Sequence, residues 1–238
     1  HIQYTWTGML PDPYTAPRYA FSTNPLLPPA PAGDGEKTLL VRFFDAAGNF
    51  TERQDSITVD SQPPHYTYVE IDGQAAYTNN PSGIVSLYIA ASDAVSGIAQ
   101  MQISNDLVFD EPFESYKVSE VHTLADPLTQ GVKWVYIHFV DYAGNVTSTP
   151  AEASIILDTA GPTISSFHIN ADASHANNRD VTLSIDASDN LSGVSGIAVA
   201  NGSLNCETAS YQAFSQTMVW RLLAGDVEKT VTICVRDG

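Results

Sequence analysis

The residues of this sequence with the clearest chemical potential are aspartates that recur at a fixed spacing. They form two sets of three, each drawn from a proline-containing segment, a polar loop and a glycine-containing turn: Asp60, Asp93 and Asp141, and Asp158, Asp189 and Asp237. Convergence of three carboxylates without a basic partner costs free energy unless a cation neutralises them, and Ca²⁺ is the natural candidate because it takes roughly six to eight oxygen ligands in irregular geometry. The competing interpretation is that each aspartate only caps the backbone amides of an ordinary turn.

These aspartates belong to a pattern that repeats along the chain. The phrase "FFDAAGNF" at 43–50 returns as "FVDYAGNV" at 139–146 and begins a third time as "VRDG" at 235–238, and both intervals are 96 residues. The phrase "IAASDAVSGI" at 89–98 returns after the same interval as "IDASDNLSGV" at 185–194. A period of this length indicates tandem domains rather than one large fold.

The period divides the chain into about two and a half units. We predict a partial repeat at 1–60 that lacks its first strands, a complete repeat at 61–158, and a repeat at 159–238 that lacks its last strand. In this alignment His1 corresponds to Gly97. Neither end unit closes a sandwich from its own residues, so either the polypeptide continues beyond both ends or other copies of the same chain supply the missing strands. We favour the second alternative and expect contacts between copies, concentrated at residues 1–60 and 200–238.

Apolar residues alternate with other residues in the repeated segments, which is the pattern of a half-buried strand. Val135, Ile137 and Phe139 show this alternation before Asp141, and the equivalent segments of the other two units repeat it. In the partial first unit we expect the apolar row of this strand to face water. Short strands, turn residues between them and a unit near 100 residues are typical of immunoglobulin-like sandwiches. The sequence therefore predicts an all-β fold of tandem immunoglobulin-like (fibronectin III-like) β-sandwiches.

The topology of such a sandwich predicts where the aspartates lie. The loop between its second and third strands and the loop between its last two strands lie at one pole, where the chain also enters. In the middle unit these segments are "ASDAVSG", "DYAGN" and the linker "VDSQPP". We therefore expect each set of three aspartates to converge, and a structural Ca²⁺ held there would stiffen the joint between successive domains.

Charge and composition narrow the function classes. The 238 residues carry 27 acidic and 10 basic side chains, a formal net charge of −17, and 43% of them are hydrophobic. A surface this acidic repels phosphate backbones and anionic headgroups, so we expect no nucleic-acid partner and no docking on anionic membranes. No apolar run approaches the roughly 20 residues of a membrane span, and we expect no membrane insertion by this segment. These properties suit an extracellular protein.

Three phrases, "GDGEKTLLVRFFDAAGN", "SNDLVFDEPFESYK" and "SIILDTAGPT", resemble the tandem immunoglobulin-like repeats of large prokaryotic cell-surface and adhesin-type proteins. The resemblance covers essentially the whole chain and implies an extracellular, cell-surface location. It implies no particular activity, because repeats of this class occur in adhesins, surface layers, filaments and exported enzymes. The proline-rich stretch at 9–33 departs from the pattern.

Two further sets of residues carry covalent chemistry. Cys206 and Cys234 both fall in the third unit, where they either form a disulfide or stay free, since the other units contain no cysteine. Four Asn-x-Ser/Thr glycosylation sequons stand at Asn49, Asn145, Asn190 and Asn201. Two of these are the "AGN" turns, so glycans there would decorate one pole of a repeat.

The sequence carries none of the common catalytic motifs, such as HExxH, a Gly-x-Ser-x-Gly elbow or a phosphate loop. Its acidic residues stand in repeated turns, which favours architecture over catalysis, and we expect no enzyme. The favoured role is a structural or adhesive extracellular repeat protein, a stalk or a subunit of a surface filament or layer. The alternative is a carbohydrate-binding or spacer module of an exported enzyme. A sugar platform needs coplanar aromatic side chains, whereas Trp6, Trp134 and Trp220 stand in different strand contexts.

Overall fold

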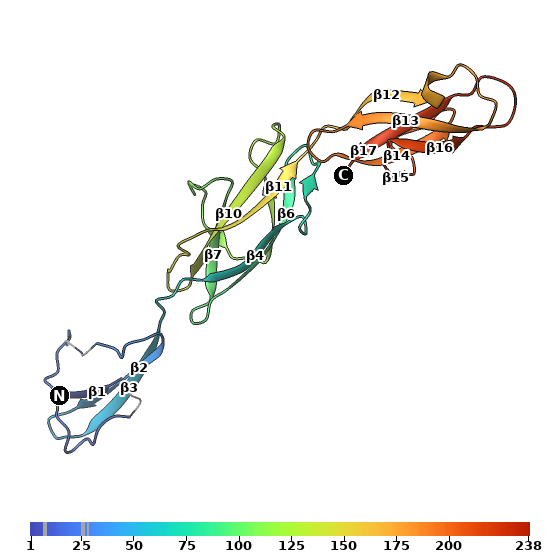
Figure 1. Ribbon diagram of the computed structural model, residues 1–238. Coiled ribbons are helices and arrows are strands. Elements are labelled where there is room, and N and C mark those ends of the chain that lie inside the picture. Colours follow the sequence, from blue (N-terminus) through green and yellow to red (C-terminus); the bar gives the residue numbers. More distant parts are fainter. Residues whose placement is uncertain (7–8, 25–26, 28) are drawn as a thin grey trace. The chain divides into compact units, whose positions relative to one another are not determined.

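The computed structural model describes residues 1–6, 9–24, 27 and 29–238. Over these residues the only helical element is a 3-10 turn, η1 (Asn170–Asp172). Nothing helical in the described part of the chain is long and apolar enough to cross a membrane. The fold is all-β, with tandem immunoglobulin-like (fibronectin III-like) β-sandwiches that follow the predicted period (Figure 1).

The chain separates into two compact units. One comprises residues 1–69, 89–118 and 136–152, and the other comprises residues 70–88, 119–135 and 153–238. The first set of three aspartates falls entirely within the first unit, and the second set falls entirely within the second. Each candidate site therefore lies inside a single compact body.

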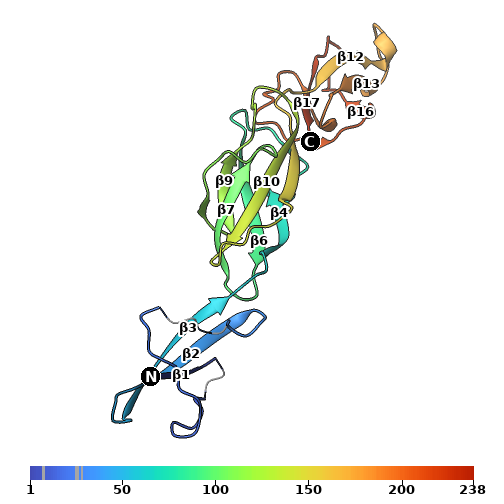
Figure 2. The ribbon, with the colours of Figure 1, turned by 90° about the vertical axis from the view of Figure 1, so that its left-hand side faces the viewer.

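The N-terminal sheet has three antiparallel strands in the order β1-β2-β3, which are labelled in Figure 2. They are β1 (Ile2–Thr5), β2 (Gly35–Phe44) and β3 (Phe50–Val59). The phrase "DAAGN" forms the tight turn between β2 and β3. Its Gly48 has φ of 94°, a conformation that only glycine adopts without a steric penalty.

The middle repeat supplies two sheets, with strand orders β4-β6-β9 and β5-β11-β10-β7-β8. Their strands are β4 (His65–Ile71), β5 (Tyr77–Thr78), β6 (Ile84–Ser92), β7 (Ile98–Ser104), β8 (Glu114–Ser115), β9 (Ser119–Thr123), β10 (Gly131–Asp141) and β11 (Ala151–Leu157). In the β7–β10 ladder, a bulge after Val140 brings Asp141 opposite Ile98, the first residue of β7. The end of β10 is thereby placed beside the loop that contains Asp93.

The third repeat is built in the same way, with sheet orders β12-β13-β16 and β15-β14-β17. Its strands are β12 (Thr163–Ile169), β13 (Asp180–Ser188), β14 (Val194–Asn201), β15 (Gln212–Ala213), β16 (Thr217–Arg221) and β17 (Val231–Asp237). Residues from both sheets make one core cluster, in which Leu183 of β13 and Ile197 of β14 are fully buried. Asp237 lies opposite Val194, the first residue of β14, as Asp141 lies opposite the first residue of β7.

The alternation of apolar residues in the sequence matches the alternation of buried side chains in the central strands β6, β10 and β13. Val135, Ile137 and Phe139 of β10 have no exposed surface, and the equivalent apolar positions of β6 and β13 are at most 3% exposed. Complete burial of such a side chain contributes about 1.5–3 kcal/mol. These positions therefore fix which face of each strand turns inward, and the prediction is confirmed.

The first repeat departs from this pattern because the proline-rich segment packs on the polar face of its sheet. Arg42 of β2 is 7% exposed and Gln3 of β1 is 1% exposed. Arg42 Nη1 donates to the Pro11 carbonyl at 2.9 Å, and Gln3 Nε2 donates to the Ala16 carbonyl at 3.1 Å. The guanidinium of Arg42 also pairs with Glu52 at 2.7 Å, which compensates the cost of burying its charge.

The apolar row of β2 is half-buried, so the prediction that it faces water is wrong. Phe21 packs against Phe43 with ring centroids 6.2 Å apart. The two rings line an apolar cavity of about 250 Å³, together with Ile2 and Val41. Phe21, which lies within the proline-rich stretch, thus covers part of this face.

The register of β1 also corrects the sequence alignment. Ile2 lies opposite Phe43 in the first repeat, and Met101 lies opposite the equivalent Phe139 in the middle repeat. His1 therefore corresponds to the residue before Met101, three positions later than predicted. The difference reflects three additional residues in the loop between β1 and β2, which a fixed period does not reveal.

Arg42, His138 and Cys234 occupy the same position in the three repeats, on the outer face of the strand that precedes the glycine-containing turn. Each of them contacts the neighbouring loop, but by a different kind of interaction. Arg42 binds the loop by hydrogen bonds, and His138 lies against Phe109 with ring centroids 4.3 Å apart. Cys234 forms a disulfide with Cys206, so the structure joins the two cysteines. Cys234 is only 3% exposed, because the linked loop covers it although it points away from the sandwich core.

Candidate metal centres

The first acidic cluster joins a linker and two loop ends. Asp60 directly follows β3, Asp93 follows β6, and Asp141 ends β10. Each offers a carboxylate oxygen, and the three oxygens all lie within 4.8 Å of one another. Asp141 is buried and the other two are half-buried. The structure therefore brings these three predicted residues together.

Backbone amides organise this cluster. Asp93 Oδ1 accepts hydrogen bonds from the N–H groups of the three residues Val95, Ser96 and Gly97, at 2.8 to 3.0 Å. Asp60 Oδ2 accepts from the same Ser96 N–H at 3.0 Å. One amide is thus shared between the linker carboxylate and the loop carboxylate, and it holds two negative charges near each other.

Asn145 completes the first cluster. Its backbone N–H donates to Asp141 Oδ1 and its side-chain amide donates to Asp141 Oδ2, both at 2.8 Å. The side-chain amide also donates to the Asp60 carbonyl at 3.1 Å. The "DYAGN" turn therefore binds its own strand end and the incoming linker at once, so the capping interpretation and the convergence interpretation both describe this site.

The second acidic cluster repeats the positions of the three aspartates and the bond from the linker aspartate to the serine amide of the loop. Asp158 follows β11, Asp189 follows β13 and Asp237 ends β17, and their carboxylate oxygens also lie within 4.8 Å of one another. Asp158 Oδ2 accepts a hydrogen bond from the Ser192 N–H at 3.1 Å. Asp189 Oδ1 accepts from the N–H of Gly193 at 2.9 Å. The structure brings the second predicted set together as it does the first.

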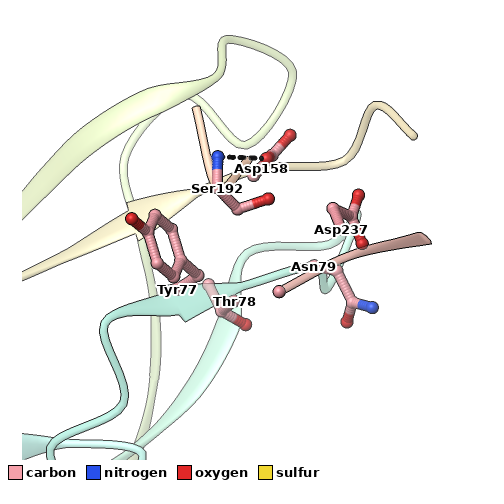
Figure 3. Close-up of a pocket in the computed structure, with 7 residues that line it drawn as sticks. Tyr77, Thr78, Asn79, Asp158, Ser192 and Asp237 are labelled. Carbon is pink, nitrogen blue, oxygen red and sulfur yellow. Dashed lines mark hydrogen bonds between the residues drawn. The ribbon is translucent and has the colours of Figure 1, made fainter. Parts of the chain in front are cut away.

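A serine hydroxyl in each cluster is buried and has no hydrogen-bond partner among the residues that the structure describes: Ser96 Oγ in the first and Ser192 Oγ in the second. Figure 3 shows the Ser192 side chain directed toward the space between Asp158 and Asp237. This space belongs to a polar cavity of about 230 Å³, whose lining also includes Thr78. A buried hydroxyl without a partner costs free energy, and a cation among the carboxylates would relieve that cost.

The pKa values of the clustered aspartates are shifted in different directions. The Ser96 side chain lies close enough to lower the pKa of the Asp60 carboxyl, although it makes no hydrogen bond of normal geometry. The backbone N–H of Leu191 is the main cause of a lowered pKa at Asp189. At Asp237 the pKa is raised, first by burial and then by the charges of the other two aspartates. In the second cluster, the repulsion among the three carboxylates therefore opposes ionisation of Asp237.

The four sequon asparagines differ in how many hydrogen bonds the side-chain amide donates. Asn145 Nδ2 uses both hydrogens, as described above, and Asn49 Nδ2 donates to Asp45 Oδ2 at 2.8 Å. Asn201 Nδ2 donates to the Arg221 carbonyl at 3.1 Å. Asn190 is exposed at the loop of the second cluster. Glycosylation of the four sequons stays a prediction.

Sequence reasoning selected the six aspartates and missed the residues that hold them. Ser96 and Ser192 were visible as the shared "SG" of the repeated loop, so their repetition was a usable signal. The bond from Asn145 to the linker carbonyl joins residues 85 positions apart, and no local pattern predicts it. The three tryptophans do not share a strand: Trp134 is in β10, Trp220 is in β16 and Trp6 follows β1.

Comparisons with known proteins find two solved structures that are similar to this chain. The chicken CNTN1 FN1-FN3 domains align with a TM-score of 0.40 at 9% sequence identity, over 84% of this chain and 71% of that chain. A tetra-tandem repeat in the extending region of a large adhesion protein aligns with a TM-score of 0.32 at 13% identity, over 86% of this chain and 48% of that one. No protein-family model and no curated protein matches the sequence.

Proposed function

We propose that this chain is a structural, adhesive-type repeat segment of an extracellular protein, either a stalk or a subunit of a surface filament or layer. Ca²⁺ bound by the two acidic clusters would fix each linker to the repeat that follows it. The observation that carries this proposal is the duplicate construction of the clusters. Asp60 binds the Ser96 amide as Asp158 binds the Ser192 amide, at 3.0 and 3.1 Å.

The donor set supports a hard divalent cation. Each cluster offers three carboxylates and a nearby buried serine oxygen, and oxygen donors of this kind suit Ca²⁺. Carbonyl and carboxylate oxygens on loops also tolerate the irregular geometry that Ca²⁺ accepts and Mg²⁺ does not. The bound ion would supply the positive charge that the clusters lack.

Two properties support the extracellular location. The Cys206–Cys234 disulfide is a bond that persists in oxidising compartments. The net charge of −17 favours solubility and repels other polyanions. The proposed role needs no catalysis, because the carboxylates would serve as ligands and turn caps. It includes self-association between copies of the chain.

Calcium titration of the intact chain tests the proposal. After treatment with a chelator, addition of Ca²⁺ should give saturable heat in calorimetry and raise the melting temperature, because a ligand that binds only the folded state stabilises it. Mg²⁺ at equal concentration should have a smaller effect. The Asp93→Asn and Asp189→Asn double variant, which retains size and the option of a cap, should lose the response. A melting curve and a small-angle scattering profile that Ca²⁺ leaves unchanged would refute the calcium-stabilised joint.

A further inference from the structure

The first strand of the middle repeat changes sheets at a turn. β4 belongs to the three-stranded sheet of this repeat, and β5 (Tyr77–Thr78) belongs to the five-stranded one. Between them, Asp72, Gly73 and Gln74 have φ of 46°, 65° and 68°, a left-handed conformation that costs free energy at the two residues that are not glycine. Contacts of the turn and of β5 must therefore compensate this cost.

The strand pair that holds β5 is short. β5 lies parallel to β11 at the edge of the sheet, with Thr78 opposite Leu157. The Ile156 N–H donates to the Ala76 carbonyl at 3.1 Å, and the Asp158 N–H donates to the Thr78 carbonyl at 2.9 Å. A two-residue strand at an edge is the kind of element that opens locally while the rest of a domain stays folded.

Asp158 connects this strand pair to the third repeat. Its main-chain N–H makes the last bond of the pair, and its side chain lies in the second acidic cluster. There Oδ1 accepts from the Ala160 N–H at 3.2 Å, and Oδ2 accepts from the Ser192 N–H at 3.1 Å. Thr78, Asp158 and Ser192 line one polar cavity (Figure 3). Because Asp158 is only 3% exposed, a displacement of its backbone would also displace its carboxylate.

The position of this carboxylate matters for a bound cation. Ca²⁺ requires its ligand oxygens at about 2.3–2.6 Å, and the oxygens of Asp158, Asp189 and Asp237 lie within 4.8 Å of one another. Release of β5 from β11 would free the main chain of Asp158 and let its carboxylate leave the cluster. Because the coupling between two equilibria is reciprocal, a cation that holds Asp158 would also hold β5.

We propose that β5 of the middle repeat positions Asp158 in the second acidic cluster, and that a cation bound there in turn keeps β5 paired with β11. The Thr78 carbonyl acts through Asp158 and is not itself a ligand. This inference rests on the proposed function and adds a consequence to it. The ion held at the third repeat controls local opening in the repeat before it.

Hydrogen exchange of the intact chain, resolved by residue with NMR, tests the coupling. Ca²⁺ should slow exchange of the Ile156 and Asp158 amides at least about fivefold. Asp189→Asn removes a ligand of the second cluster without altering β5 and should abolish this slowing. Asp93→Asn is the matched control, because it makes the equivalent change in the first cluster, and it should leave the slowing intact. Slowing that persists in Asp189→Asn, or that both variants lose equally, would overturn the proposal.

A pair of variants at Thr78 tests the positioning. In a parallel pair of this phase the Thr78 N–H points to β11, so Thr78→Pro removes a bond of the pair, whereas Thr78→Ala retains the backbone. Both are made in the Asp93→Asn background and titrated with Ca²⁺ in a calorimeter. Thr78→Pro should weaken binding at least about fivefold, and Thr78→Ala less than about twofold. Equal losses would show that the Thr78 side chain is a ligand, and an unchanged affinity with proline would show that β5 does not position Asp158.

A measurement without divalent ions separates this inference from the calcium-stabilised joint. In chelator, exchange of the Ser192 amide, which is bonded to the Asp158 carboxylate, should be at least about fivefold faster in Thr78→Pro than in Thr78→Ala. If this holds while Ca²⁺ gives no heat, the joint is refuted and the positioning of Asp158 by β5 stands. If Ca²⁺ binds while exchange of the Ile156 and Ser192 amides is unchanged, the inference is refuted and the joint stands.

Discussion

Asp60 Oδ2 accepts a hydrogen bond at 3.0 Å from the backbone N–H of Ser96, which lies 36 residues later in the chain. Ser96 N–H is also bonded to Asp93, so one amide links the incoming linker to a loop of the repeat that follows. In the next repeat Asp158 accepts the corresponding bond. The linkers are therefore attached to these loops by neutral donors, and the carboxylates beside them are left with uncompensated charge.

Asp141→Ala should lower the free energy of unfolding by about 1–3 kcal/mol in the presence of a chelator, because it removes the acceptor of two part-buried hydrogen bonds from Asn145. Asp45→Ala is the matched control. Asp45 makes the same two bonds to Asn49, also at 2.8 Å, but it is exposed, so its loss should be smaller. Urea denaturation measures both, and equal losses would show that burial of the first cluster does not matter.

Asp237→Asn should have effects of opposite sign with and without calcium. Because the pKa of Asp237 is raised in the folded chain, its contribution to stability is fully present below the ordinary aspartate pKa of about 4 and is lost as the pH rises through the folded value. Without divalent ions, the variant should therefore be more stable than the parent at pH 7 and show no such advantage at pH 3. With Ca²⁺, it should be less stable. The measurement is the melting temperature of both proteins at pH 7 without divalent ions, at pH 3 without divalent ions, and with Ca²⁺. A variant that is never more stable than the parent would contradict the repulsion between Asp237 and the other two aspartates.

Replacement of both Cys206 and Cys234 by serine should destabilise the third repeat by about 3–4 kcal/mol. The disulfide spans 28 residues, and closure of a loop of that length reduces the entropy of the unfolded chain by this amount in the chain-entropy model. Chemical denaturation followed through hydrogen exchange should show the loss in residues 163–237 and spare β1 to β3. A uniform loss along the chain would mean that the repeats unfold as one cooperative unit.

Expression in a host with an N-glycosylation pathway should modify Asn190 in preference to Asn145. Attachment of a glycan replaces one hydrogen of the side-chain amide, and Asn145 uses both, for Asp60 and Asp141. Asn190 is exposed. Peptide mass spectrometry measures the occupancy of each sequon, and high occupancy at Asn145 in folded protein would contradict the arrangement of the first cluster.

Periodicity allowed much of this molecule to be predicted. The alternation at Val135, Ile137 and Phe139 depends only on the two-residue repeat of a strand and the free energy of apolar burial. The 96-residue interval identified equivalent turns, and the common topology of a sandwich then indicated that the six aspartates would meet in two groups. Both inferences depend on features that are repeated in the sequence.

The sequence by itself therefore determined the all-β class, the repeat and the membership of the two acidic clusters. Only the tertiary structure decided the register of β1, because a three-residue insertion shifts the strand without changing its pattern. Only the tertiary structure decided that Arg42 is buried, because the loop that covers it approaches from 31 residues away. The same holds for the shared Ser96 amide. These features depend on which segments meet in space, and a hydrogen bond between distant residues leaves no periodic signal in the chain.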